Sequence, residues 1–354
     1  MMRVLALPLL AAMAMAAAPM PNWAVVRPGV PIVFPRDHGA HPDFRTEWWY
    51  LTGWLQTADG KPLGFQVTFF RTRPAVDQAN PSRFAPRQIL FAHAALSDPA
   101  NARLLHGQRL ARAGFGLAET ATADMDVRLE DWYLRRQPGG TLVTRASGPG
   151  FALDLAFTPT QSPLLQGRAG YSQKGPNPAE ASHYYSLPQL KVSGNIVRGG
   201  RVQRVTGTAW MDREWSSTLL NARAIGWDWL GLNMDDGGAL TLFRVRDKAG
   251  KAVWAGGSWR PRGGASINLL PSQIGWQDGP VWRSVRTGAR YPVSPRVTVT
   301  LPARTLVVPV TPLMADSELD SRRGGGPVYW EGAVRVPGGK GYLEMTGYAA
   351  PLKM

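Results

Sequence analysis

Carboxylates that stand beside large aromatic rings form three clusters along this chain. The clusters are Glu47-Trp48-Trp49-Tyr50, Asp212-Arg213-Glu214-Trp215 and Trp227-Asp228-Trp229. Indole and phenol rings combine a large apolar area with an electron-rich face, so they line protein cores and ligand cavities alike. A carboxylate among such rings must be paired, accept hydrogen bonds or carry a proton. These clusters are therefore the first candidates for a chemical site.

The second cluster has the spacing of a carboxyl pair in a strand. Residues two apart in a strand face the same side, so Asp212 and Glu214 share one side while Arg213 faces the other. Repulsion between two neighbouring carboxylates raises the pKa of one of them, which then keeps its proton near neutral pH. Glu47 either faces a cavity as a proton donor or pairs with an arginine. A salt-bridge network at a domain junction is the alternative for all three carboxylates.

One histidine completes the set of candidate catalytic residues. His93 lies in an otherwise apolar strand, where it is either a satisfied core histidine or a proton shuttle in a cavity. The candidate catalytic residues are Asp212, Glu214, Glu47 and His93. The candidate ligand-binding residues are Trp48, Trp49, Tyr50, Tyr184, Tyr185, Trp215, Trp227, Asp228 and Trp229. Core packing is the competing role for these rings, and Glu331 and Glu344 in the C-terminal aromatic strands are interpreted as structural.

The composition argues against several other classes of function. The chain has no cysteine, and its five histidines lack metal-ligand spacing, so we expect no metal and no cofactor. Nucleophile elbows, Walker loops and dinucleotide-binding motifs are not found. The formal net charge of +15 comes mainly from scattered arginines, which do not form a nucleic-acid groove. A solvated basic surface is the simplest interpretation, and attraction to anionic lipid headgroups is the alternative.

Strand patterns fill most of the chain and predict an all-β fold. Short β-rich segments such as 65–72, 88–97 and 151–158 alternate with turn signals such as Asp59-Gly60 and Gly199-Gly200. Tight turns between neighbouring strands favour antiparallel meanders that close into barrels. The rhythm breaks after Trp215, so a domain boundary is expected at about Ser216.

The N-terminus resembles a secretory signal peptide. Arg3 precedes an apolar, alanine-rich run, and residues 16–18 are alanines that suit cleavage, so residues 1–18 are predicted to be a leader. We therefore expect a soluble periplasmic protein.

Motifs along nearly the whole chain resemble those of the AttH / carotenoid 1,2-hydratase family, which includes hydroxyneurosporene synthase. The motifs are Thr46-Glu47-Trp48-Trp49-Tyr50, residues 64–71, residues 91–95, His183-Tyr184-Tyr185-Ser186, residues 211–215, residues 226–229, Tyr329-Trp330-Glu331-Gly332 and residues 341–348. The resemblance implies two tandem lipocalin-like antiparallel β-barrels with few short helices, in domains at 19–215 and 216–354. The family contains hydratases and proteins of unknown function, some of them associated with ABC exporters.

Two functions follow from these residues and from the resemblance. In the first, a barrel cavity lined by aromatic and aliphatic side chains binds an elongated apolar lipid or isoprenoid, which passes to or from an inner-membrane ABC exporter. In the second, a hydratase protonates a carbon–carbon double bond with Asp212 or Glu214, and indole faces stabilise the carbocation. Carotenoid hydratases of the family commonly have an Asp-His motif where this chain has Asp212-Arg213. Because an arginine cannot shuttle protons, the sequence favours binding.

Overall fold

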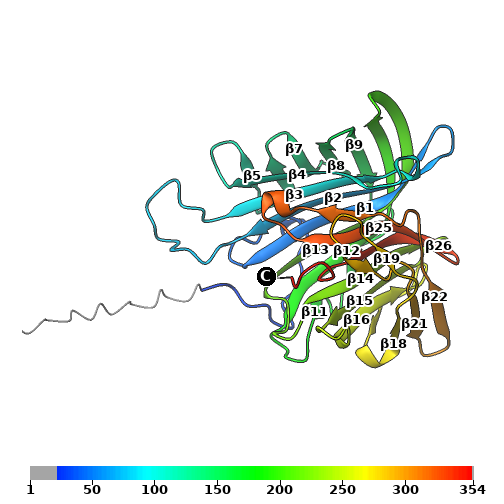
Figure 1. Ribbon diagram of the computed structural model, residues 1–354. Coiled ribbons are helices and arrows are strands. Elements are labelled where there is room, and N and C mark those ends of the chain that lie inside the picture. Colours follow the sequence, from blue (N-terminus) through cyan, green and yellow to red (C-terminus); the bar gives the residue numbers. More distant parts are fainter. Residues whose placement is uncertain (1–21, 353–354) are drawn as a thin grey trace, which may run out of the picture.

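The computed structural model describes residues 22–352 and is all-β, as predicted, with two tandem antiparallel barrel-like units (Figure 1). The predicted leader at 1–18 lies outside these residues. The helices are short 3-10 turns: η1 (Arg36–His38), η2 (Pro99–Asn101), η3 (Pro271–Gln273) and η4 (Arg322–Gly324). Between residues 22 and 352, no helix has the length and apolar character needed to cross a bilayer.

The first unit is a 13-stranded antiparallel sheet in the order β4-β3-β2-β1-β13-β12-β9-β8-β7-β6-β5, with β10 and β11 paired to β12. Its strands are β1 (Thr46–Thr57), β2 (Pro62–Thr72), β3 (Ile89–Ser97), β4 (Leu105–Arg112), β5 (Ala118–Thr120), β6 (Asp126–Leu129), β7 (Trp132–Arg136), β8 (Leu142–Gly148), β9 (Phe151–Thr158), β10 (Leu164–Leu165), β11 (Tyr171–Gln173), β12 (Ala181–Arg198) and β13 (Arg201–Thr218). The sheet curls until β4 meets β8, where a Cβ on Gly107 would lie 2.5 Å from the carbonyl oxygen of Ser147. Only glycine permits this approach, which brings the sheet close to a closed barrel.

The second unit is an eight-stranded sheet in the order β17-β16-β15-β14-β26-β25-β23, with β24 paired to β25. Its strands are β14 (Gly226–Met234), β15 (Ala239–Arg246), β16 (Ala252–Arg260), β17 (Ile267–Leu269), β23 (Thr311–Pro312), β24 (Glu318–Asp320), β25 (Val328–Val336) and β26 (Gly339–Met345). Two small sheets pair β18 (Ile274–Gln277), β21 (Arg296–Thr300) and β22 (Thr305–Pro309), and β19 (Trp282–Arg283) with β20 (Arg290–Tyr291). The first sheet ends at Thr218 and the second begins at Gly226, slightly after the boundary expected at Ser216.

Where the two sheets meet, alternation along the strands gives each sheet a second apolar face. In β1, Trp49 and Leu51 belong to the core of the first unit, whereas Tyr50 belongs to a separate cluster at the junction of the two sheets. In β14, Leu230 and Leu232 face the core of the second unit. Residues of alternate parity in a strand must face opposite sides, so β1 and β14 each contribute to one barrel core and to the junction.

The junction holds the two sheets together through indole contacts. The indole nitrogen of Trp54 donates to the carbonyl oxygen of Gly341 over 3.0 Å, and Trp210 packs against Trp229 with ring centroids 6.4 Å apart. Figure 1 shows β14, β25 and β26 lying beside β1 and β13. The two units therefore share a continuous apolar seam.

Candidate functional site

A pocket with a cavity volume of about 200 Å³, partly open to solvent, lies in this seam. Its aromatic lining comes from both sheets: Trp48, Tyr50, Phe70, Phe91, Trp227, Trp229, Phe243 and Tyr329. The sequence predicted a cavity inside a barrel, but this pocket lies outside the interior of the first barrel. Large side chains such as Trp49, Phe65 and Trp132 pack the interior of the first barrel, whereas the pocket lies between the two sheets.

Asp212 lies on the wall that the first sheet contributes and accepts three hydrogen bonds. Ser186 Oγ and Trp210 Nε1 donate to its Oδ1 over 2.5 and 2.6 Å, and Tyr184 OH donates to its Oδ2 over 2.7 Å. Burial raises the pKa of Asp212 to about 7, although the three donors lower it, and the nearby Glu214 adds to the increase. Asp212 can therefore gain or lose a proton near neutral pH, and its three donors support the ionised form.

Glu214 lies beside Asp212 and has a cationic partner. Lys174 Nζ lies 3.0 Å from its Oε1, and Ser182 Oγ donates to the same oxygen. The ammonium group also lies 4.5 Å from the ring centroid of Tyr184 and 4.3 Å from that of Phe243. The pair thus forms a charged corner of a pocket whose lining is mainly aromatic. No sequence pattern pointed to Lys174, which lies far before Glu214 in a loop rich in glycine and proline.

Glu331 and Glu344 form a second carboxyl pair, on the wall that the second sheet contributes. They stand directly opposite each other on β25 and β26, and both line the pocket. Trp227 Nε1 donates to Glu344 over 3.2 Å, whereas Glu331 Oε1 has no hydrogen-bond partner within residues 22–352. Burial raises the pKa of Glu344 to about 8 and that of Glu331 well above its ordinary value, and the charge of Glu344 adds to the shift of Glu331.

The sequence analysis interpreted Glu331 and Glu344 as structural, but the structure places them in the pocket. The sequence does contain a pattern that could have identified Glu331 as a site residue, because Tyr329-Trp330-Glu331 places a carboxylate beside aromatic rings as the other clusters do. Their opposition across two strands depends on register, which composition does not reveal.

His93 lines the same pocket from β3. Its Nδ1 lies 2.7 Å from the hydroxyl of Tyr329. Burial lowers the pKa of His93 to about 3, so the imidazole is neutral at physiological pH. A neutral ring bonded to a tyrosine suits a polar contact to a ligand better than storage of a proton.

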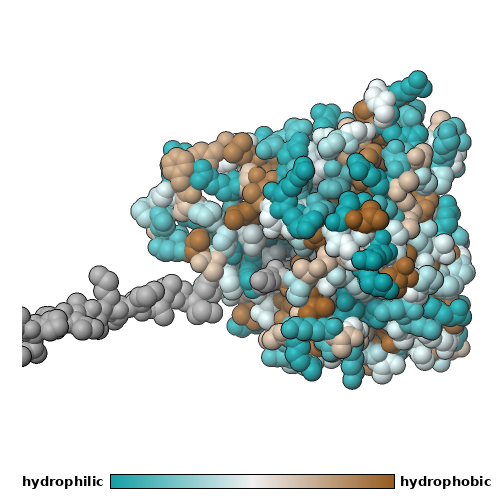
Figure 2. Space-filling view, in the orientation of Figure 1, coloured by the Kyte–Doolittle hydropathy of each residue, from teal (hydrophilic) through white to brown (hydrophobic). Residues whose placement is uncertain are grey.

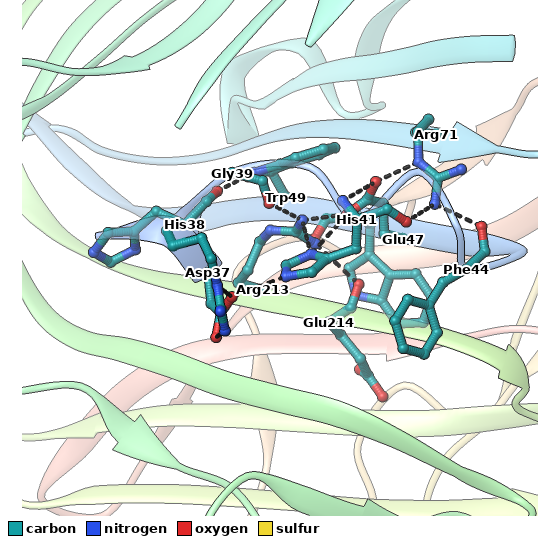
Figure 3. Close-up of polar contacts among 12 residues, drawn as sticks. Asp37, His38, Gly39, His41, Phe44, Glu47, Trp49, Arg71, Arg213 and Glu214 are labelled. Atoms are coloured by element: carbon teal, nitrogen blue, oxygen red, sulfur yellow. Dashed lines mark hydrogen bonds and ion pairs between the residues drawn. The ribbon is translucent and has the colours of Figure 1, made fainter. Parts of the chain in front are cut away.

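Glu47 faces away from the pocket, into the first barrel. Figure 3 shows it between the guanidinium groups of Arg71 and Arg213, and the backbone N–H of His41 also donates to it over 3.0 Å. Burial alone would raise the pKa of Glu47, but Arg213, His41 and Arg71 together hold it well below its usual range. The interpretation of Glu47 as a cavity acid is therefore corrected to the alternative, an arginine-paired carboxylate.

Four other candidate residues also lie on the side of their strands away from the pocket. Trp49 Nε1 donates to the carbonyl oxygen of His38 over 2.9 Å, and Tyr185 OH lies 2.6 Å from His38 Nδ1. The Trp215 ring stacks on His41 with centroids 3.8 Å apart.

The last of the four is Asp228. It lies between Arg244 and Arg246, at 2.6 and 3.0 Å. Strand alternation explains why these four residues face away from the pocket. Each is next in the chain to a residue that lines the pocket or forms a hydrogen bond to a residue that does.

The structure brings the remaining candidates together at the junction. Asp212, Glu214, His93, Trp48, Tyr50, Trp227 and Trp229 line the pocket. Tyr184 reaches it through hydrogen bonds, because its hydroxyl donates to Asp212 and accepts from Trp229 Nε1 over 3.0 Å. Carboxyl groups with raised pKa values thus stand on both walls of one aromatic pocket.

Comparison with known proteins agrees with this architecture. A crystal structure assigned to AttH from Nitrosomonas europaea is similar over 92% of this chain and 99% of its own, with 50% identity and a TM-score of 0.85. Kievitone hydratase from Nectria haematococca shares the fold over 94% of this chain and 98% of its own, with 14% identity and a TM-score of 0.62. The dehydratase asqC of Emericella nidulans is 29% identical over 97 residues, which span 27% of this chain and 26% of that protein. The sequence model of the AttH-like family matches residues 25–348, so this chain belongs to the AttH-like family.

Proposed function

We propose that this protein is a hydro-lyase that adds water to, or removes it from, an apolar substrate held between the two barrels. The observation that carries the proposal is the presence of carboxyl groups with pKa values near neutrality on opposite walls of one aromatic pocket. Acid–base catalysis is most effective when the pKa of the acid or base lies near the working pH.

The two carboxyl sites suit opposite halves of the reaction. Glu344, with a pKa of about 8 and Glu331 facing it, holds a proton at neutral pH and donates it to an alkene carbon. Asp212, whose ionised form accepts three hydrogen bonds, takes a proton from the water that attacks the adjacent carbon. The π bond of the alkene, the O–H bond of the Glu344 carboxyl and one O–H bond of the water break, while one C–H bond, one C–O bond and an O–H bond on Asp212 form.

The rings between the two walls suit the cationic intermediate of such an addition. Trp229 and Tyr50 meet edge to face with centroids 5.3 Å apart, and both line the pocket. The electron-rich faces of indole and phenol attract a positive charge, more strongly where water is excluded. Elimination of water would use the same groups in reverse.

The position of Arg213 removes the argument that favoured binding over hydration. Its guanidinium lies in the first barrel beside Glu47, on the other side of the sheet from the pocket. The lack of a histidine at this position therefore says nothing about proton transfer in the pocket. The names of kievitone hydratase and of the dehydratase asqC support the same reaction class for this chain.

A carrier of an apolar ligand is the second candidate, favoured by the predominance of rings in the pocket lining. Export to the periplasm and delivery to an ABC exporter would fit either function, and both remain proposals.

Incubation in oxygen-18 water tests the reaction. The protein is mixed with acyclic polyenes, and products are analysed by mass spectrometry. We expect a labelled alcohol from the wild type and from the control Asp43→Asn, whose side chain is 86% exposed, but not from Asp212→Asn or Glu344→Gln. Retention of a probe without any labelled product would support the carrier, and equal product from all variants would refute the assigned roles.

A further inference from the structure

An exposed patch of phenylalanine, leucine and arginine lies on the first barrel, beyond the pocket. It consists of Arg83 and Phe84 in the β2–β3 loop, Leu110 and Arg112 in β4, and Phe115 in the β4–β5 loop. Phe84, Leu110 and Phe115 are 65, 56 and 48% exposed. The two phenylalanine rings stack on each other with centroids 5.4 Å apart.

The rings of this patch are held in place by the fold. The Arg112 guanidinium lies 4.9 Å from the Phe84 ring and 4.7 Å from the Phe115 ring, and its Nη1 donates to the Phe84 carbonyl oxygen over 2.9 Å. Phe115 has a φ of 58° between Gly114 and Gly116, a left-handed conformation that is rare for a bulky residue. The chain therefore adopts an unfavourable backbone to keep a large apolar ring at the surface.

The surroundings of the patch carry a strong positive bias. Residues 73–88 and 110–117 contain four arginines (Arg73, Arg83, Arg87 and Arg112) and a single aspartate, Asp77. Figure 1 shows the β2–β3 loop projecting away from the body of the molecule, and Figure 2 shows hydrophobic surface along this projection. Exposed apolar rings on a projecting basic loop match the interface of an anionic bilayer, which offers both apolar depth and negative headgroups.

The patch is continuous with the pocket. Trp48, Phe70, Phe91 and Leu110 are successive cross-strand partners on β1, β2, β3 and β4, so all four side chains lie on one face of the sheet. The first three line the pocket, and Phe70 and Phe91 stack with centroids 4.4 Å apart. Leu110 then reaches the exposed patch, two residues before Arg112 on the same face.

We propose that this patch docks the protein on the surface of an anionic phospholipid bilayer, with Phe84 and Phe115 inserted among the headgroups. Arg83 and Arg112 contact the phosphates, and the aromatic row leads from the lipid to the pocket. Docking does not depend on the reaction proposed above, because it concerns residues outside the pocket.

Vesicle flotation tests the docking, with phosphatidylcholine vesicles that contain or lack phosphatidylglycerol. The protein and its variants are purified from the same host. The intact mass of each is recorded, so that all of them are known to begin at the same residue. We expect binding to the anionic vesicles, weakened about tenfold by Phe84→Ser with Phe115→Ser. Arg83→Gln and Arg112→Gln should each weaken it about fivefold, on anionic vesicles alone.

Matched controls are Val202→Ser and Val285→Ser, which replace valines that are 71 and 93% exposed elsewhere on the surface. These variants should bind like the wild type. Equal loss in the controls, or unchanged binding in the phenylalanine variant, would overturn the proposal. A wild-type dimer in light scattering that becomes monomeric in the phenylalanine variant would overturn it in favour of self-association.

Discussion

Replacement of Asp212 by asparagine should stabilise the protein increasingly as the pH rises. Asp212 has a pKa of about 7 in the folded protein, against about 3.9 in an unfolded chain. Below about pH 4, both states carry the proton and the group has no effect on the free energy of unfolding. Between about pH 4 and 7, the unfolded state loses its proton first, so the wild type loses stability.

The size of this effect follows from the difference between the two pKa values. About three pKa units correspond to about 4 kcal/mol, which the wild type has lost once the pH exceeds about 7. Asparagine carries no charge and avoids this loss. It also replaces an acceptor oxygen with an amide nitrogen facing Tyr184 or Ser186, which costs about 1–3 kcal/mol at every pH. The test is therefore how the difference in free energy of unfolding between Asp212→Asn and the wild type changes with pH, rather than the size of that difference at one pH.

Urea denaturation at about pH 5 and about pH 8, with unchanged m-values, measures this quantity. We expect the stability of Asp212→Asn relative to the wild type to rise by about 3 kcal/mol between these values. The exposed Asp43→Asn serves as the control and should show no such rise. A difference that stays constant with pH would mean that Asp212 is ionised throughout, and would refute its role as a group poised near neutrality.

Three other predictions concern the buried charges. Glu47→Gln leaves two fully buried guanidinium groups without their carboxylate, so it should lower the free energy of unfolding by about 3–5 kcal/mol. Urea denaturation measures this loss, and the exposed control Glu119→Gln should change the free energy of unfolding by less than about 1 kcal/mol. Turnover should peak between the pKa of Asp212, about 7, and that of Glu344, about 8, and a plateau down to acidic pH would contradict these assignments. Because the Trp227 hydrogen bond lowers the pKa of Glu344, Trp227→Phe should move the alkaline limb of the rate profile to higher pH, and a move to lower pH would contradict this contact.

The sequence alone was sufficient for the relations within single strands. The alternation of Trp48, Trp49 and Tyr50, the shared side of Asp212 and Glu214 and the opposite direction of Arg213 all follow from the two-residue repeat of a strand. The repeated strand and turn signals likewise determined the all-β class. These features are local, so they need no knowledge of what lies across the sheet.

The tertiary structure alone decided which side of each strand lines the pocket. Both sides of β1 and β13 carry large aromatic rings, so their pattern did not distinguish the packed barrel interior, where Glu47 lies, from the seam, where Asp212 lies. The opposition of Glu331 and Glu344, and the approach of Lys174 to Glu214, required strand register and the packing of one barrel on the other. Local periodicity specifies directions relative to a strand, whereas a site between two sheets is specified by contacts between residues far apart in the chain.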